Sequence, residues 1–147
     1  MPLDEGLKSL YNALILEHDR RPRNEGPLEG ATHEASEDNP LCGDEITVRL
    51  SAPAGAVDAA RFEGRGCALS RASASLMTEA LAGKGLAEAL ALADAFEASL
   101  EGRAPAPSAG LEAFAGVRDF PSRVGCATLA WRALRGAIGG GGPAPGR

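Results

Sequence analysis

The sequence predicts one domain that combines a β-hairpin with several amphipathic helices. Residues 46–50 alternate apolar and polar side chains, which is the period-2 pattern of a strand with one buried face. Several longer segments instead repeat apolar residues every three or four positions, as helices with one buried face do. The chain has 147 residues, a length typical of one compact domain, and we expect residues 1–138 to form it.

The first helix is expected from about Asp4 to Asp19. One apolar stripe runs along this segment and consists of Leu3, Leu7, Leu10, Leu14 and Ile15. The helix must end near Arg21, because Pro22 disfavours helical geometry in the residue before it. His18 lies at this helix end, where we expect it to cap the helix or to lie at the surface.

Two strands are predicted in the middle of the chain, over residues 46–50 and 57–63. Because only a short turn that contains Pro53 and Gly55 separates them, antiparallel pairing is the natural arrangement. A third strand, over residues 31–38, has a weaker signal.

The second half of the chain is predicted to be mostly helical. We expect helices over residues 67–81, 86–100 and 121–138, with a short helical turn over residues 111–114. Residues 139–147 are rich in glycine and proline. We expect this tail to be disordered, because it has too few apolar residues to offset the entropy lost on ordering.

Charge and composition exclude several kinds of partner. The formal net charge is -5 and aromatic residues are few, so we expect no nucleic-acid partner. No apolar stretch reaches the roughly 20 residues of a membrane span, and the N-terminus lacks the pattern of a signal peptide. We therefore expect no membrane partner and a cytoplasmic location. Three widely spaced cysteines favour a metal site or a reactive thiol over a disulfide framework.

Four residues are candidates for that site. In an extended segment Cys42 and Asp44 would point to the same side, and Gly43 permits a tight turn. Cys67 lies where a glycine-flanked loop enters a helix, so the helix dipole would stabilise its thiolate. Cys126 lies near the start of the last helix in a similar setting. Packing in the core is the alternative interpretation for each cysteine.

If the fold brings these four side chains together, they form a set of three thiolates and one carboxylate. Such a set suits tetrahedral zinc or the edge of an iron–sulfur cluster. Because its oxygen is a harder donor than sulfur, Asp44 is expected to be the exchangeable ligand. Spacing alone does not show that the residues meet.

Four motifs follow one another along the chain. They are His18 with Pro22-Arg23-Asn24 and Gly26, Asn39-Pro40-Leu41-Cys42-Gly43-Asp44, Phe62-Glu63-Gly64-Arg65-Gly66-Cys67, and Cys126-Ala127-Thr128-Leu129 with Trp131. Together and in this order, they make the sequence resemble the IscU/NifU N-terminal family of iron–sulfur cluster assembly proteins, and most of all its SUF-associated branch, SufU. The resemblance covers nearly the whole chain.

The resemblance implies an α+β fold, in which helices pack a small three-stranded antiparallel sheet and the three cysteines and Asp44 cluster at one end. It also implies a cysteine desulfurase as partner, which would deliver persulfide sulfur to one thiol, with Cys42 as the expected acceptor. A SUF-type scaffold or apo iron–sulfur proteins would receive the product. Zinc is the metal expected in the isolated protein, and a transient [2Fe–2S] cluster is the other expected occupant.

Two features separate the chain from the Isc branch. The segment between Cys67 and Cys126 is long and holds the extra helix over residues 86–100, as in SufU-like members. Residues 120–125 replace the Leu-Pro-Pro-Val-Lys chaperone motif and the histidine of that branch. We therefore expect no dependence on an Hsp70-type chaperone, and Gly125 offers no ligand.

Three functional hypotheses remain open. In the first, the protein accepts sulfur from the desulfurase and serves as a cluster scaffold on the site of three cysteines and Asp44. In the second, it is an enzyme, a zinc-dependent persulfide sulfurtransferase that passes sulfur to a SUF-type scaffold. In the third, zinc only stabilises the fold. The sequence leaves the physiological metal, the oligomeric state and the downstream acceptor open.

Overall fold

The computed structural model describes residues 12–41 and 43–139. Its elements follow the chain in this order: α2 (Ala13–Arg20), β1 (His33–Asn39), β2 (Asp44–Ser51), β3 (Ala59–Arg65), α3 (Ala68–Leu81), α4 (Leu86–Leu100), the 3-10 helix η1 (Leu111–Asp119) and α5 (Pro121–Gly139). The α+β class is confirmed. Within these residues, no helix has the length and apolar character that a membrane span requires.

The sheet has three antiparallel strands in the order β1-β2-β3. The predicted hairpin corresponds to β2 and β3, which are in register from Glu45 opposite Arg65 to Ser51 opposite Ala59. The weakly signalled third strand is β1, whose last residue Asn39 pairs with Asp44. All three strand predictions are therefore confirmed, with ends that differ by a few residues.

Strand β2 has one buried face and one more exposed face. The buried face consists of Asp44, Ile46, Val48 and Leu50. On the other face, Arg49 bridges the two outer strands through ion pairs with Glu34 (2.8 Å) and Glu63. Because side chains alternate along a strand, Asp44 lies on the same face as the apolar core residues.

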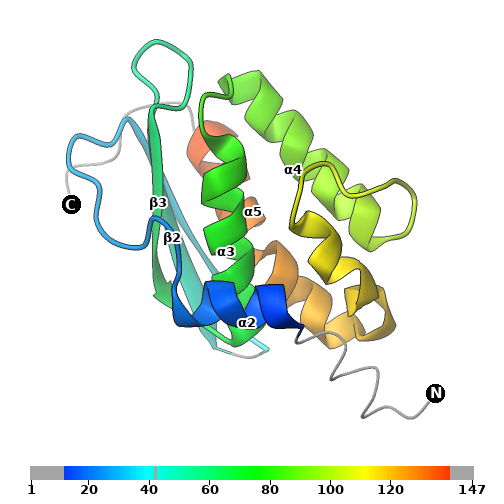
Figure 1. Ribbon diagram of the computed structural model, residues 1–147. Coiled ribbons are helices and arrows are strands. Elements are labelled where there is room, and N and C mark those ends of the chain that lie inside the picture. The colour runs from blue at the N-terminus through cyan, green and yellow to red at the C-terminus, as the bar shows by residue number, and fades with distance from the viewer. Residues whose placement is uncertain (1–11, 42, 140–147) are drawn as a thin grey trace.

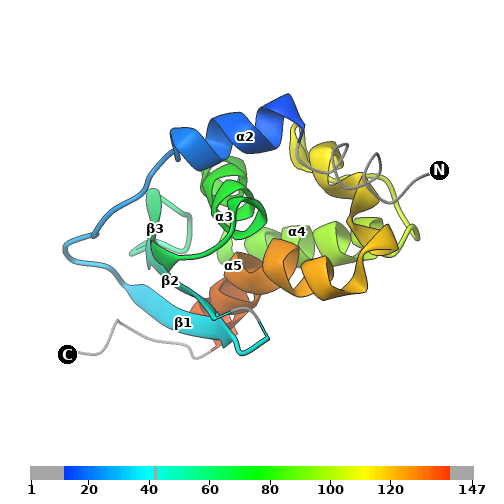
Figure 2. The ribbon, with the colours of Figure 1, turned by 90° about the horizontal axis from the view of Figure 1, so that it is seen from below.

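The helices cover one face of the sheet (Figures 1 and 2). Helix α5 packs against β1 and β2, and α3 packs against β3 and α5, while α2 lies on α3. Helix α4 and η1 pack on α5. The core between them includes Trp131, which stacks on Phe96 at a centroid distance of 4.8 Å.

Several predicted helix boundaries need correction. The first helix does not run unbroken from Asp4 to Asp19: Asn12 has an extended backbone and caps α2, with its Oδ1 accepting a hydrogen bond from the Ile15 amide (3.2 Å). Residues 1–11 lie outside the described residues. The turn predicted over residues 111–114 continues to Asp119. Helix α5 includes Gly139, and the rest of the predicted tail, residues 140–147, lies outside the described residues.

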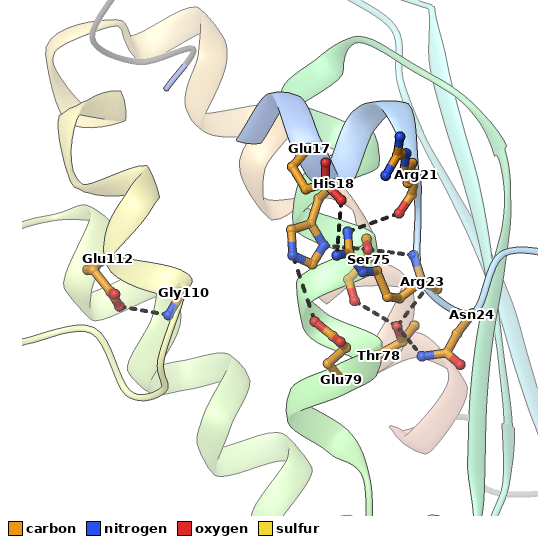
Figure 3. Close-up of polar contacts among 10 residues, drawn as sticks. All are labelled: Glu17, His18, Arg21, Arg23, Asn24, Ser75, Thr78, Glu79, Gly110 and Glu112. Carbon is orange, nitrogen blue, oxygen red and sulfur yellow. Dashed lines mark hydrogen bonds and ion pairs between the residues drawn. The ribbon is translucent and has the colours of Figure 1, made fainter. Parts of the chain in front are cut away.

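The prediction that His18 caps a helix or lies at the surface is wrong. The residue is only 3% exposed, and its Nδ1 shares a hydrogen bond of 2.7 Å with Ser75 Oγ on α3 (Figure 3). The backbone amide of Arg23 donates to the same Oγ (2.8 Å), and Asn24 donates to Thr78 Oγ1 (3.0 Å). These contacts hold the end of α2 and the following loop on α3.

Candidate metal centre

Three of the four predicted site residues meet at the end of the sheet where β1 turns into β2. Asp44 is the first residue of β2, Cys67 precedes α3, and Cys126 lies in the first turns of α5. Their potential ligand atoms all lie within 4.8 Å of one another. Cys42 lies outside the described residues.

Asp44 is held at this point by the turn between β1 and β2. Gly43 has a φ of +74°, and its amide donates to the carbonyl of Asn39 (2.8 Å). A positive φ favours glycine, so the residue type fits the turn. The backbone at Gly43 is therefore not extended, and it makes the tight turn that its residue type predicts. Asp44 joins the site because it starts the buried face of β2 and is itself 6% exposed.

Cys67 is the N-cap residue of α3, as its position after Gly66 predicts, and it makes no side-chain capping hydrogen bond. A Cβ on Gly66 would lie 2.9 Å from Ser70 Cβ and 3.3 Å from the Asp44 carboxyl group. The close approach of these residues therefore requires glycine at position 66.

The pKa of the Cys67 thiol is lowered to about 6. A hydrogen bond from Cys126 to the thiolate is the largest cause, and a hydrogen bond from the backbone of Ser70 adds to it. Burial and the nearby Asp44 carboxylate act in the opposite direction. The thiolate of Cys67 is thus the favoured form at neutral pH, as a metal ligand requires.

Cys126 lies one turn and a half into α5 and is 1% exposed. Pro121 starts the helix, as predicted, because its fixed φ suits a first helical position. The preceding residue, Gly125, lies close to the Asn39 side chain: a Cβ there would lie 2.8 Å from Asn39 Nδ2 and would require that side chain to shift. Because glycine has no side chain, no side-chain ligand comes from position 125.

Ser70 belongs to this centre, and the sequence predictions missed it. Its hydroxyl donates to Asp44 Oδ2 at 2.6 Å and lies 3.7 Å from Cys67 Sγ. The amide of Cys67 donates to the same Oδ2 at 3.3 Å. A serine three residues after the N-cap faces the same side of the first helical turn, and this spacing is the signal that could have identified it.

The donor set fits a thiophilic divalent ion. Two ligands of one tetrahedral zinc ion lie roughly 3.8 Å apart when each bond is about 2.3 Å long. The three described ligand atoms are at most 4.8 Å apart, so an inward movement of about 1 Å brings them to zinc distances. Two thiols and a carboxylate favour zinc or iron in a sulfur environment over the oxygen-preferring magnesium or calcium.

Known proteins that resemble this chain include a zinc-dependent protein and an iron–sulfur cluster assembly protein. Residues 10–139 match the family model described as NifU-like N terminal domain. The chain is 38% identical over 141 residues to the zinc-dependent sulfurtransferase SufU of Bacillus subtilis, covering 94% of this chain and 95% of the relative. It is 42% identical over 136 residues to the iron–sulfur cluster assembly scaffold protein IscU of Streptococcus pyogenes, covering 90% of this chain and 84% of the relative.

Solved structures have the same fold. The crystal structure of a putative iron–sulfur cluster assembly scaffold protein for the SUF system from Fervidobacterium islandicum superimposes with a TM-score of 0.82 at 30% identity, covering 88% of this chain and 96% of the other. The N-terminal part of a nitrogen-fixing NifU-like protein from Brucella abortus also gives a TM-score of 0.82 at 30% identity, with 90% and 94% coverage. Each superposition therefore covers most of both chains.

Proposed function

The chain belongs to the family of NifU-like N-terminal domains, and from that premise we propose that it serves iron–sulfur cluster assembly as a zinc-dependent sulfurtransferase. The observation that carries this proposal is the convergence of Asp44, Cys67 and Cys126 within 4.8 Å. Its partner would be a cysteine desulfurase, and a SUF-type scaffold or an apo iron–sulfur protein would receive the sulfur. The predicted cytoplasmic location fits this role and stays a prediction.

Cys42 completes the proposed zinc ligand set. It is two residues from Asp44, so covalent geometry keeps their Cα atoms within about 7 Å of each other. Bound zinc would keep the thiols of the site deprotonated at neutral pH. Asp44 remains the ligand that we expect to leave most readily, because oxygen is a harder donor than thiolate.

Sulfur transfer would begin with the Cys42 thiolate, which attacks the outer sulfur of a Cys–S–SH group on the desulfurase. A new S–S bond forms on Cys42 while the persulfide bond of the desulfurase breaks, and the desulfurase cysteine leaves as a thiolate. The persulfide proton stays on the transferred sulfur. The step therefore needs no external oxidant or reductant.

Two observations favour sulfur transfer over cluster assembly on the protein. The relative named as a zinc-dependent sulfurtransferase aligns over nearly the full length of both chains. Position 125 offers no side chain that could replace a departing ligand. A scaffold function is the second candidate, because the relative from Streptococcus pyogenes is named a scaffold and thiolates also ligate iron–sulfur clusters.

The decisive experiment measures how the zinc-loaded protein stimulates its cognate cysteine desulfurase, with iron absent. We expect strong stimulation that Cys42→Ala abolishes and Asp44→Ala reduces. Glu45→Ala is the matched control for Asp44→Ala, because it removes the neighbouring carboxylate from the exposed face of β2. Absence of stimulation, with a cluster that forms once iron is supplied, would instead support the scaffold. If neither stimulation nor cluster formation is observed, only a structural role for zinc remains.

A further inference from the structure

We propose that Ser70 is a positioning residue that fixes the carboxylate of Asp44 for metal binding. The inference rests on the proposed function only in requiring that the site holds a metal. Ser70 is not itself a ligand in this proposal, and it acts through Asp44.

The contacts between these residues are short and buried. Ser70 is 0% exposed and Asp44 is 6% exposed, so water does not compete effectively for the 2.6 Å hydrogen bond between them. The serine hydroxyl has one hydrogen to donate. Cys67 Sγ is 3.7 Å away, whereas Asp44 Oδ2 is at the distance of a strong charge-assisted hydrogen bond, so the hydrogen goes to the carboxylate.

Two donors therefore converge on one oxygen of Asp44. The Cys67 amide reaches Oδ2 from the start of α3, and the Ser70 hydroxyl reaches it from the first turn of the same helix. Together they fix the rotation of the carboxylate about its Cβ–Cγ bond and disfavour ligation through both oxygens at once. Partners of this kind orient a metal ligand and typically change affinity by about 10- to 100-fold when they are lost.

The packing around Ser70 leaves it little freedom to move away. A Cβ on Gly66 would lie 2.9 Å from Ser70 Cβ, so the chain passes directly over this side chain. The close packing holds the Ser70 side chain beside Asp44, to which its hydroxyl donates.

The test measures zinc affinity by competition with a chelator and the absorption spectrum of the cobalt-substituted protein. We expect Ser70→Ala to weaken zinc binding about tenfold and to shift the cobalt d–d bands. Ser73→Ala is the matched control: Ser73 is equally buried on α3, but its hydroxyl donates to the Ala127 carbonyl (2.6 Å). We expect it to leave the cobalt spectrum unchanged.

A double-mutant cycle with Asp44→Ala decides whether Ser70 acts through Asp44. If it does, Ser70→Ala has no further effect on zinc affinity once Asp44 is gone. An equal loss in both backgrounds, or wild-type affinity in Ser70→Ala, would overturn the inference. These zinc-affinity measurements contain no desulfurase, so their outcome does not depend on whether the protein transfers sulfur. A wild-type protein that binds no zinc would overturn both proposals.

Discussion

The two ends of α3 use buried polar groups in opposite ways. Towards the C-terminal end, Ser75 and Thr78 form hydrogen bonds with His18, Arg23 and Asn24 at the end of α2 and in the loop that follows it. We call this set the α2–α3 clamp. At the N-terminal end, Cys67 and Ser70 face Asp44 and Cys126, and we call these four residues the acidic cluster.

The difference lies in how the groups satisfy one another. The clamp joins donors to acceptors without any added component, and these buried hydrogen bonds stabilise the fold. The acidic cluster contains two thiols and a carboxylate, and their ionised forms repel one another in a buried place. A bound cation is therefore needed for all three groups to be ionised at once. Stability and chemistry are thus divided between the two ends of one helix.

The largest effect is expected from Cys126→Ala, which removes one of the proposed ligands from the acidic cluster. Zinc affinity should fall by at least about 100-fold, because even the loss of an outer partner costs 10- to 100-fold. In wild type, free zinc at 100 times its dissociation constant should raise the free energy of unfolding by about 2.7 kcal/mol. Chelator competition and thermal unfolding measure the two effects. A variant that zinc still stabilises by that amount would remove Cys126 from the ligand set.

His18→Ala tests the clamp alone. We expect the free energy of unfolding of the zinc-free protein to fall by about 2 kcal/mol, because the change leaves a cavity and removes the buried hydrogen bond between His18 Nδ1 and the Ser75 hydroxyl. Zinc affinity should stay unchanged. Arg20→Ala, at an exposed position of the same helix, is the control and should change stability by less than about 0.5 kcal/mol. A parallel loss of zinc affinity in His18→Ala would show that the two ends are not independent.

The clamp should also make stability depend on pH. Burial lowers the pKa of His18 below 6.5, and Arg23 lowers it further, while Glu79 and Glu17 act in the opposite direction. The unfolded chain therefore binds the proton more readily, so the contribution of neutral His18 is complete above pH 6.5 and is lost as pH falls towards the lowered value. One such group adds a slope of at most about 1.4 kcal/mol per pH unit. Chemical denaturation of zinc-free wild type and His18→Gln measures it, and identical slopes would contradict it.

The smallest effect on stability and zinc affinity is expected from Leu41→Ser, in the turn that precedes Asp44. Leu41 is 85% exposed, so its loss should leave stability within about 0.5 kcal/mol of wild type and zinc affinity unchanged. If the desulfurase docks here, burial of this side chain supports the complex. We then expect stimulation to need roughly fivefold more protein, with Leu41→Met close to wild type. Unchanged stimulation would place the docking surface elsewhere.

Much of the fold could be predicted from local patterns. The period-2 segment became β2, Pro121 started α5, and Cys67 took its place before α3, because each depends on neighbours in the sequence. The burial of His18 could not be predicted, because its partner Ser75 is 57 residues away. For the same reason the bond from Ser70 to Asp44, 26 residues apart, appears only once the sheet and α3 are packed together.

The position of Asp44 has a consequence for how this sequence can change in length. Its carboxylate faces the site because it is an even number of residues from Ile46, Val48 and Leu50 on one face of β2. One residue inserted between Asp44 and Ile46 would turn the carboxylate to the solvent side of the sheet. Two inserted residues would return it to the buried face, but two positions further along the strand from Ile46. Insertions between the end of α3 and the start of α5 carry no such parity requirement, since α4 and η1 pack on α5. The segment that holds α4 can therefore lengthen or shorten over evolution, while the few residues around Asp44 must be inherited without gaps.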